Sequence, residues 1–241
     1  MSQNISKKQM AGAFYVSQDY LFPESDCRLE ALNKAKNIME AVNKNVNILA
    51  ERLIDKHYQF VNSDRIITKP DSTDWISELQ NKGIYLPISL QAWVEIVGSV
   101  NFMGSCPDWH FTGYCFDHSD EDKPLVYTDP LVIEVDKDYI LYEFENWEYQ
   151  IKEYGFDEVG PFKIPIAPDA LHKAAVSGGP PYEVTGDQAC VDSIVFNERH
   201  GFSLIAYLRH ALSWGGFPGF ELIDDYPHDF VNEMRRSLVN I

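Results

Sequence analysis

The sequence predicts an α+β protein in which an antiparallel or mixed sheet is flanked by helices, with a long N-terminal helix. Three observations predict this class: a helical stripe spans residues 25–57, strand-like runs separated by Pro and Gly fill the middle, and helical spacing returns near the C-terminus. Helices before and after a block of strands are typical of α+β proteins, not of alternating βαβ folds. We expect one domain over residues 1–241, with an N-terminal helical segment (1–69) and an α+β core (70–241).

The long helix is predicted from Ser25 or Asp26 to about His57. Its apolar residues recur three and four positions apart, at Leu32, Ala35, Met39, Val42, Val46, Leu49 and Leu53. This spacing places them on one stripe of the helix, and Asp26 is a suitable N-cap. We favour packing of the stripe within the monomer; a coiled-coil seam in an oligomeric scaffold is the alternative.

Two shorter helices should follow the break at Lys69-Pro70. Ser72 or Asp71 can cap the first, and Gly83 ends it. Pro87 favours the first turn of the second, which Gly98 ends.

The central part is expected to be rich in strands, because its apolar runs are bounded by Pro and Gly at hairpin-like spacing. The predicted strands are Val100–Met103, Leu125–Thr128, Leu131–Val135, Tyr139–Phe144, Phe162–Ile166, Tyr182–Thr185 and Ser193–Phe196. Residues 146–154 fit a helix or a strand equally well.

The C-terminal part returns to helix. Apolar residues at Phe202, Ile205, Leu208 and Leu212 share one helical face, and the glycines and proline of residues 214–219 form a stop signal. Pro227 suits the first turn of a last helix, which should run to about Val239.

Composition restricts the class of protein further. A hydrophobic content of 45% is that of a packed globular chain, and no apolar run approaches the roughly 20 residues that span a bilayer. We interpret the polar start as lacking an export signal. The four cysteines include no Cys-x-x-Cys pair, which favours free thiols in a reducing compartment. We therefore expect a cytoplasmic protein.

Charge excludes some partners and favours others. The chain has 20 basic and 37 acidic side chains, a net charge of −17. Direct binding to nucleic acid or to an anionic membrane needs clustered Lys and Arg, so we expect neither. A partner with a basic surface is favoured instead.

The net charge is concentrated in residues 117–158, which carry fourteen acidic and three basic side chains interleaved with aromatic rings. Carboxylates can steer a basic protein to this segment, and aromatic rings can anchor it. The predicted contact residues are Asp117, Asp120, Glu121, Asp122, Asp136, Asp138, Tyr142, Glu143, Glu145, Trp147 and Glu148, with Tyr142 and Trp147 as anchors. The alternative is that the rings face the core and the carboxylates are the solvated side of strands.

Catalytic and metal-binding motifs are weak. Cys106, His110, Cys115 and His118 could chelate zinc in one loop, but they lack the usual Cys-x2-Cys turn. Neither a nucleophile elbow nor a phosphate-binding glycine motif occurs. The remaining candidates have structural explanations: Asp169, His172 and Lys173 fit a short capped helix, His200 a helix start and His210 a core edge. We expect no cofactor and no metal site.

The chain resembles the SMI1/KNR4 (SUKH) superfamily. Leu86-Pro87-Ile88-Ser89-Leu90 with Trp93, followed by Gly98-Ser99-Val100-Asn101-Phe102, resembles that family's LP-x-x-L helix and first strand. Asp129-Pro130-Leu131 and the block from Tyr207-Leu208-Arg209 to Trp214-Gly215-Gly216-Phe217-Pro218-Gly219 add to the likeness, which covers roughly residues 70–220.

The resemblance implies an α+β fold and an immunity protein that neutralises a toxin, often a nuclease, by binding it. It supplies no catalytic residues. We therefore expect a non-enzymatic inhibitor of a basic, nuclease-like toxin, present as a monomer or homodimer. The alternatives are a metal-dependent enzyme at the Cys106 cluster and the oligomeric scaffold.

Overall fold

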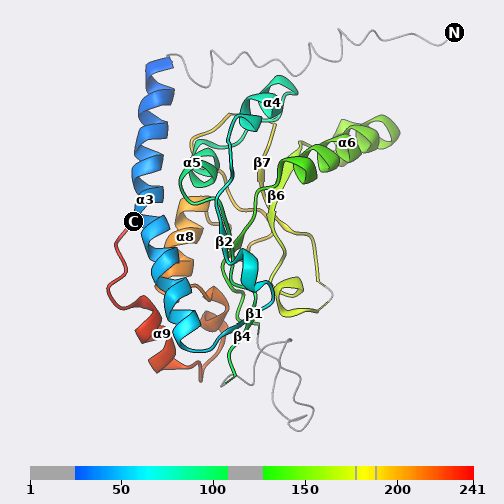
Figure 1. Ribbon diagram of the computed structural model, residues 1–241. Helices are drawn as coiled ribbons and strands as arrows, with labels where there is room; N and C mark the ends of the chain where they lie inside the picture. Colours follow the sequence, from blue (N-terminus) through cyan, green and yellow to red (C-terminus); the bar gives the residue numbers. More distant parts are fainter. Residues whose placement is uncertain (1–24, 108–126, 177, 188) are drawn as a thin grey trace, which may run out of the picture.

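The computed structural model describes residues 25–107, 127–176, 178–187 and 189–241 (Figure 1). Its helices and small antiparallel sheets confirm the α+β class and the long N-terminal helix. None of the described helices is both long enough and apolar enough to cross a membrane.

Helix α3 (Ser25–Asp55) forms one side of the molecule and packs against α5 (Ile88–Ile96) and α9 (His228–Arg235) (Figure 1). Its predicted stripe is buried inside this chain: Ala35, Met39, Val42, Val46, Leu49 and Leu53 are all in the core. The polar Asn45 is also buried, where its side chain exchanges two hydrogen bonds with the backbone of Val239 (2.7 and 2.8 Å). Packing within the monomer is therefore confirmed, and a coiled-coil seam built from this stripe is wrong.

The strands are short and pair in three small sheets. The first joins β1 (Gln59–Phe60) to β4 (Gly104–Ser105), and the third joins β6 (Lys163–Ala167) to β7 (Tyr182–Thr185). The second has the order β2 (Ile67–Thr68), β3 (Ser99–Asn101) and β5 (Val132–Ile133). A hydrogen bond from Glu134 N–H to the Ile166 carbonyl (2.8 Å) links the second sheet to the third.

The remaining elements are helical. They are the 3₁₀ turn η1 (Ser63–Arg65), α4 (Trp75–Asn81), α6 (Lys137–Tyr154), α7 (Phe156–Val159), η2 (His172–Ala174), α8 (Leu204–Ser213) and η3 (Pro218–Leu222). Glycines end three helices as predicted: Gly83 follows α4, Gly98 follows α5, and Gly215 and Gly216 follow α8, all with positive φ.

One predicted strand is wrong, because residues 139–144 lie inside α6. The Asp136 side chain accepts a hydrogen bond from Tyr139 N–H (2.8 Å) and caps this helix. Ile140, Phe144 and Trp147, three and four positions apart, then turn to the body of the protein. Tertiary packing of this stripe therefore overrides the strand propensity of Tyr139-Ile140-Leu141-Tyr142.

Four other predictions need smaller corrections. Residues 193–196 form only isolated bridges, and the predicted strand 131–135 pairs only at Val132–Ile133. Of the predicted strand 125–128, the first two residues lie outside the described residues, and Tyr127 and Thr128 are not in a strand. The last helix stops at Arg235 instead of Val239, because Ser237 has positive φ and Val239 bonds to Asn45.

A buried polar group lies between β7, α8 and η2. The Lys173 ammonium donates to Asp129 Oδ1 (2.7 Å), and the Tyr182 hydroxyl donates to Asp129 Oδ2 (3.0 Å). Lys173 therefore points into the core and does not share an exposed face with His172, which is half exposed and pairs with Asp169. Burial and the Asp129 carboxylate raise the pKa of Tyr182, so its hydroxyl keeps its proton and acts as the donor.

The Tyr207 hydroxyl is buried beside this group and finds no hydrogen-bond partner among the described residues. An unsatisfied buried hydroxyl costs about 1–3 kcal/mol. Replacing Tyr207 by phenylalanine should therefore leave the free energy of unfolding unchanged or raise it by up to about 1 kcal/mol. Urea denaturation checks this result. Tyr182→Phe is the control, since it removes a hydrogen bond to Asp129 and should cost about 1–2 kcal/mol.

Candidate functional site

Helix α6 projects from the body of the protein, away from α3 and α8 (Figure 1). Of its 18 residues, only Ile140 is fully buried. Because so little of this helix is buried against its own chain, most of its surface is accessible to solvent or to a binding partner. The Asp136 cap starts α6, and an ion pair between Lys137 and Glu78 ties that first turn to α4.

One face of α6 holds it to the protein. Phe144 contacts Phe162 edge to face (centroids 5.0 Å apart), and Trp147 stacks on Phe144 (5.3 Å). The Trp147 indole N–H also donates to the Gly160 carbonyl (2.9 Å). Trp147 is therefore half-buried and serves the attachment of α6, whereas the sequence suggested an exposed anchor.

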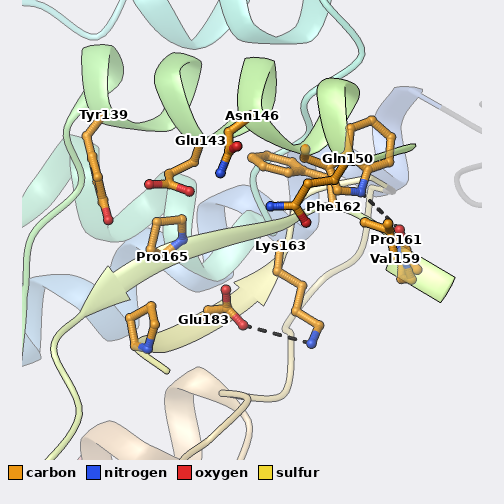
Figure 2. A pocket seen from close by; sticks show the side chains of 13 residues that line it. Tyr139, Glu143, Asn146, Gln150, Val159, Pro161, Phe162, Lys163, Pro165 and Glu183 are labelled. Carbon is orange, nitrogen blue, oxygen red and sulfur yellow. Dashed lines mark hydrogen bonds and ion pairs between the residues drawn. The ribbon is translucent and has the colours of Figure 1, made fainter. Parts of the chain in front are cut away.

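A second face of α6 lines an open groove of about 530 Å³. Figure 2 shows Tyr139, Glu143, Asn146 and Gln150 extending from the helix toward the β6–β7 hairpin. These four residues are spaced four, three and four positions apart, so they form one line along the helix. Lys163, Pro165, Pro181 and Glu183 form the hairpin side of the groove.

The groove is electrostatically suited to a cation. Glu183 is half-buried and lies 3.8 Å from the Lys163 ammonium. Desolvation raises the pKa of Glu183; Lys163 and the Asn197 amide oppose the shift, and the nearby Glu143 carboxylate adds to it. A further positive group entering the groove would favour the charged form of Glu183.

The third face of α6 points outward. Asp138, Tyr142, Glu145 and Tyr149 are exposed and again spaced four, three and four positions apart. We call these four residues the outer stripe. Tyr142 and Tyr149 are 64% and 60% exposed, which places them among the most exposed large hydrophobic residues of the described part of the chain. Carboxylates and tyrosines therefore alternate along an exposed line of the helix.

Seven of the eleven predicted contact residues belong to this site. Asp136 is the cap of α6, and Asp138, Tyr142, Glu143, Glu145, Trp147 and Glu148 lie along the helix. Asp117, Asp120, Glu121 and Asp122 lie outside the described residues. The sequence did not assign Tyr139, Tyr149 or the groove, because their spacing becomes informative only once this segment is a helix. It also counted Asp129 with the acidic segment, whereas Asp129 is buried and paired with Lys173.

The metal cluster that the sequence offers only as an alternative has one of its four residues among those described. Cys106 is buried just after β4, and His110, Cys115 and His118 lie outside the described residues. Cys27 and Cys190 are free thiols, and burial with nearby carboxylates raises the pKa of Cys190 to about 11, which makes it a poor nucleophile.

Comparison with known proteins gives no relative: no family model, curated protein or solved structure matches the chain.

Proposed function

We propose that this protein is a non-enzymatic, immunity-type inhibitor that neutralises a basic, nuclease-like toxin by binding it through α6. The observation that carries the proposal is an 18-residue helix with a single fully buried residue and exposed tyrosines between carboxylates. The resemblance to SMI1/KNR4 proteins supplies the biological class, and the geometry of α6 supplies the surface.

Charge supports a basic partner. Residues 136–158 carry eight acidic and two basic side chains, and one of the two lysines, Lys137, is already paired with Glu78. A nuclease binds phosphates through clustered Lys and Arg, and an acidic helix is complementary to such a cluster. The carboxylates raise the association rate and exclude acidic proteins.

The exposed tyrosines support a tight complex. Tyrosine side chains bury a large area and lose little conformational entropy, so they recur as the residues that dominate binding energy. Tyr142 and Tyr149 lie two turns apart on the outer stripe, where a groove on a partner can receive both. The groove beside α6 adds a second contact, in which a Lys or Arg of the partner reaches Glu143 and Glu183.

The test measures binding to a basic nuclease toxin encoded beside the gene of this protein. Tyr142→Ala with Tyr149→Ala should weaken the Kd by at least about 30-fold, because two anchors are removed while alanine preserves the helix. Asp138→Lys with Glu145→Lys should lower the association rate at least about 10-fold at low salt. Biolayer interferometry at two salt concentrations gives both values.

The matched control is Glu40→Lys with Glu51→Lys, which changes the net charge equally on the exposed face of α3. It should alter the association rate far less than the α6 reversal. If both α6 variants bind as the unmodified protein does, or if the α3 control has an equal effect, α6 is not the contact surface.

A further inference from the structure

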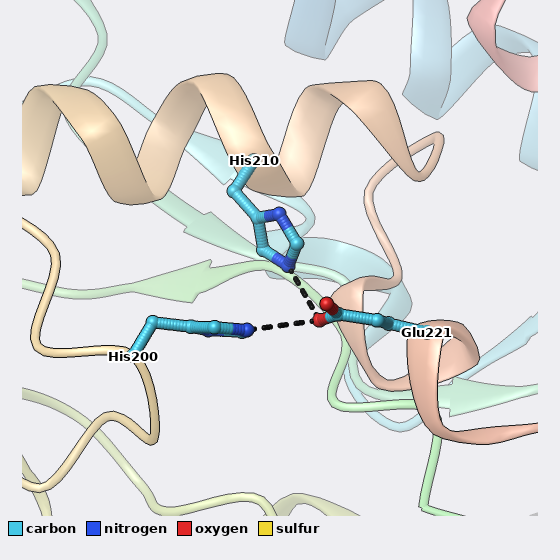
Figure 3. Close-up of side chains that lie close together, drawn as sticks. All are labelled: His200, His210 and Glu221. Carbon is cyan, nitrogen blue, oxygen red and sulfur yellow. Dashed lines mark ion pairs between the residues drawn. The ribbon is translucent and has the colours of Figure 1, made fainter.

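Two histidines and a glutamate from three separate segments meet at one point (Figure 3). His200 lies in the loop before α8, His210 lies on α8, and Glu221 lies on η3. The Nε2 atoms of His200 and His210 are 3.0 and 3.1 Å from the same oxygen, Oε2 of Glu221. All three candidate ligand atoms lie within 4.8 Å of one another.

A hydrogen bond to Glu198 fixes the tautomer of His200. Its Nδ1 lies 2.7 Å from Oε1 of Glu198, a side chain that is only 3% exposed. An ionised carboxylate only accepts hydrogen bonds, so Nδ1 carries the proton and its N–H donates a hydrogen bond to Glu198. In the neutral ring Nε2 then carries no proton, and its lone pair is available to a cation. A carboxylate that holds a histidine in this way is the usual support of a metal-binding imidazole.

The second histidine is unsatisfied. Nε2 of His210 is buried and makes no hydrogen bond to any described residue, although Oε2 of Glu221 is 3.1 Å away. Phe202 fixes both rings, since it stacks on His200 (centroids 4.6 Å apart) and meets His210 edge to face (5.4 Å). Two imidazole nitrogens and a carboxylate oxygen are therefore held around one point by packed neighbours.

We propose that His200, His210 and Glu221 form a binding site for a divalent transition-metal ion of the zinc class. Two imidazoles and one carboxylate are a ligand set that Zn²⁺ takes, with a fourth position left for water. Zinc bonds of about 2.0–2.1 Å put ligand atoms about 3.3 Å apart in a tetrahedral site, close to the two contacts that Glu221 already makes. This site is independent of α6 and of the proposed toxin binding.

Arg199 is the competing cation. Its guanidinium donates to Oε2 of Glu221 (2.7 Å) and to the Pro218 carbonyl (2.7 Å), and its Nε lies 3.5 Å from Nε2 of His200. A metal ion must share the Glu221 carboxylate with Arg199 or displace it. Removing the guanidinium should therefore raise metal affinity, whereas a purely structural ion-pair cluster predicts only lost stability.

The test uses the full-length protein, stripped with a chelator and titrated with Zn²⁺ by calorimetry and with Co²⁺ by visible absorption. We expect one equivalent to bind, and His210→Ala or Glu221→Gln to weaken the Kd at least about 100-fold. Loss of the supporting carboxylate in Glu198→Gln should weaken it about 10–100-fold. Arg199→Gln should tighten it at least about 3-fold.

Two controls separate this site from others. His172→Ala removes another histidine that pairs with a carboxylate, Asp169, and should leave the Kd unchanged. A variant without Cys106, His110, Cys115 and His118 should still bind one equivalent, which excludes that alternative loop cluster as its source. Circular dichroism of each metal-free variant confirms that it is folded.

A second readout is thermal. The ion would join the loop before α8, α8 itself and η3, so saturating Zn²⁺ at about 100 times the Kd should raise the Tm by roughly 5–10 °C. Failure of the unmodified protein to bind a stoichiometric ion, or retention of its full affinity in both His210→Ala and Glu221→Gln, overturns the proposal.

Discussion

Replacing Lys173 by methionine should destabilise the protein by about 3–5 kcal/mol. The Lys173 side chain is 0% exposed and that of Asp129 is 6% exposed, so the pair is desolvated. Its ammonium also lies 4.4 Å from the centroid of the Tyr182 ring. Methionine fills similar space but leaves the Asp129 carboxylate charged in an apolar environment with only the Tyr182 hydroxyl as a donor among these groups. Urea unfolding followed by circular dichroism gives the change.

The control for Lys173→Met is the double variant Lys173→Met with Asp129→Asn. Asparagine removes the unpaired charge and tolerates the positive φ of residue 129 (45°). The double variant should therefore be more stable than Lys173→Met alone. If the double variant lost as much stability as Lys173→Met or more, the two side chains would not be energetically coupled, contrary to the geometry.

Replacing Gly98 by alanine should destabilise the protein by at least about 3 kcal/mol. Gly98 has a φ of +91°, and a Cβ there would lie 2.2 Å from the Thr68 carbonyl oxygen and 2.9 Å from the Lys69 Cα. Both are backbone atoms: Thr68 belongs to β2, and Lys69 follows it. Because β2 pairs with β3, which begins directly after Gly98, these atoms cannot move without disturbing the sheet. Thermal and urea unfolding measure the loss.

Gly83→Ala is the matched control for Gly98→Ala. Gly83 also follows a helix and has a φ of +87°, but a Cβ there meets nothing within 4 Å. Gly83→Ala should therefore lower the free energy of unfolding only by the strain of the left-handed backbone, about 1–2 kcal/mol. The difference between the two variants is the cost of the steric contact with residues 68–69, and equal losses would show that this contact is relieved.

Most helices could be predicted from sequence, because their signals are local. The stripe of α3, the proline and glycine that bound α5 and the double glycine after α8 act through residues near in sequence, and each appears where predicted. The strands were harder, since β1, β2, β4 and β5 are two residues long and depend on partners far along the chain.

Helix α6 shows how a local signal can be misread. Its third to sixth residues (139–142) have high strand propensity. The longer spacing of Ile140, Phe144, Trp147 and Ile151 predicts a helix only over a wider window. The helix is stabilised by contacts of Phe144 with Phe162 and of Trp147 with Gly160, and both partners lie beyond the end of the helix. The acidic and aromatic composition of the surface could be predicted, but its arrangement in an outer stripe and a groove could not.

The sequence by itself determined the class of the fold, the long buried helix and the concentration of acidic and aromatic residues that α6 carries. Only the tertiary structure decided which of these side chains are exposed and which distant residues meet. Asp129 and Lys173, 44 positions apart, become a buried pair, and His200, His210 and Glu221 converge from three segments. Periodicity and capping act within a few residues, whereas such contacts depend on how the elements pack.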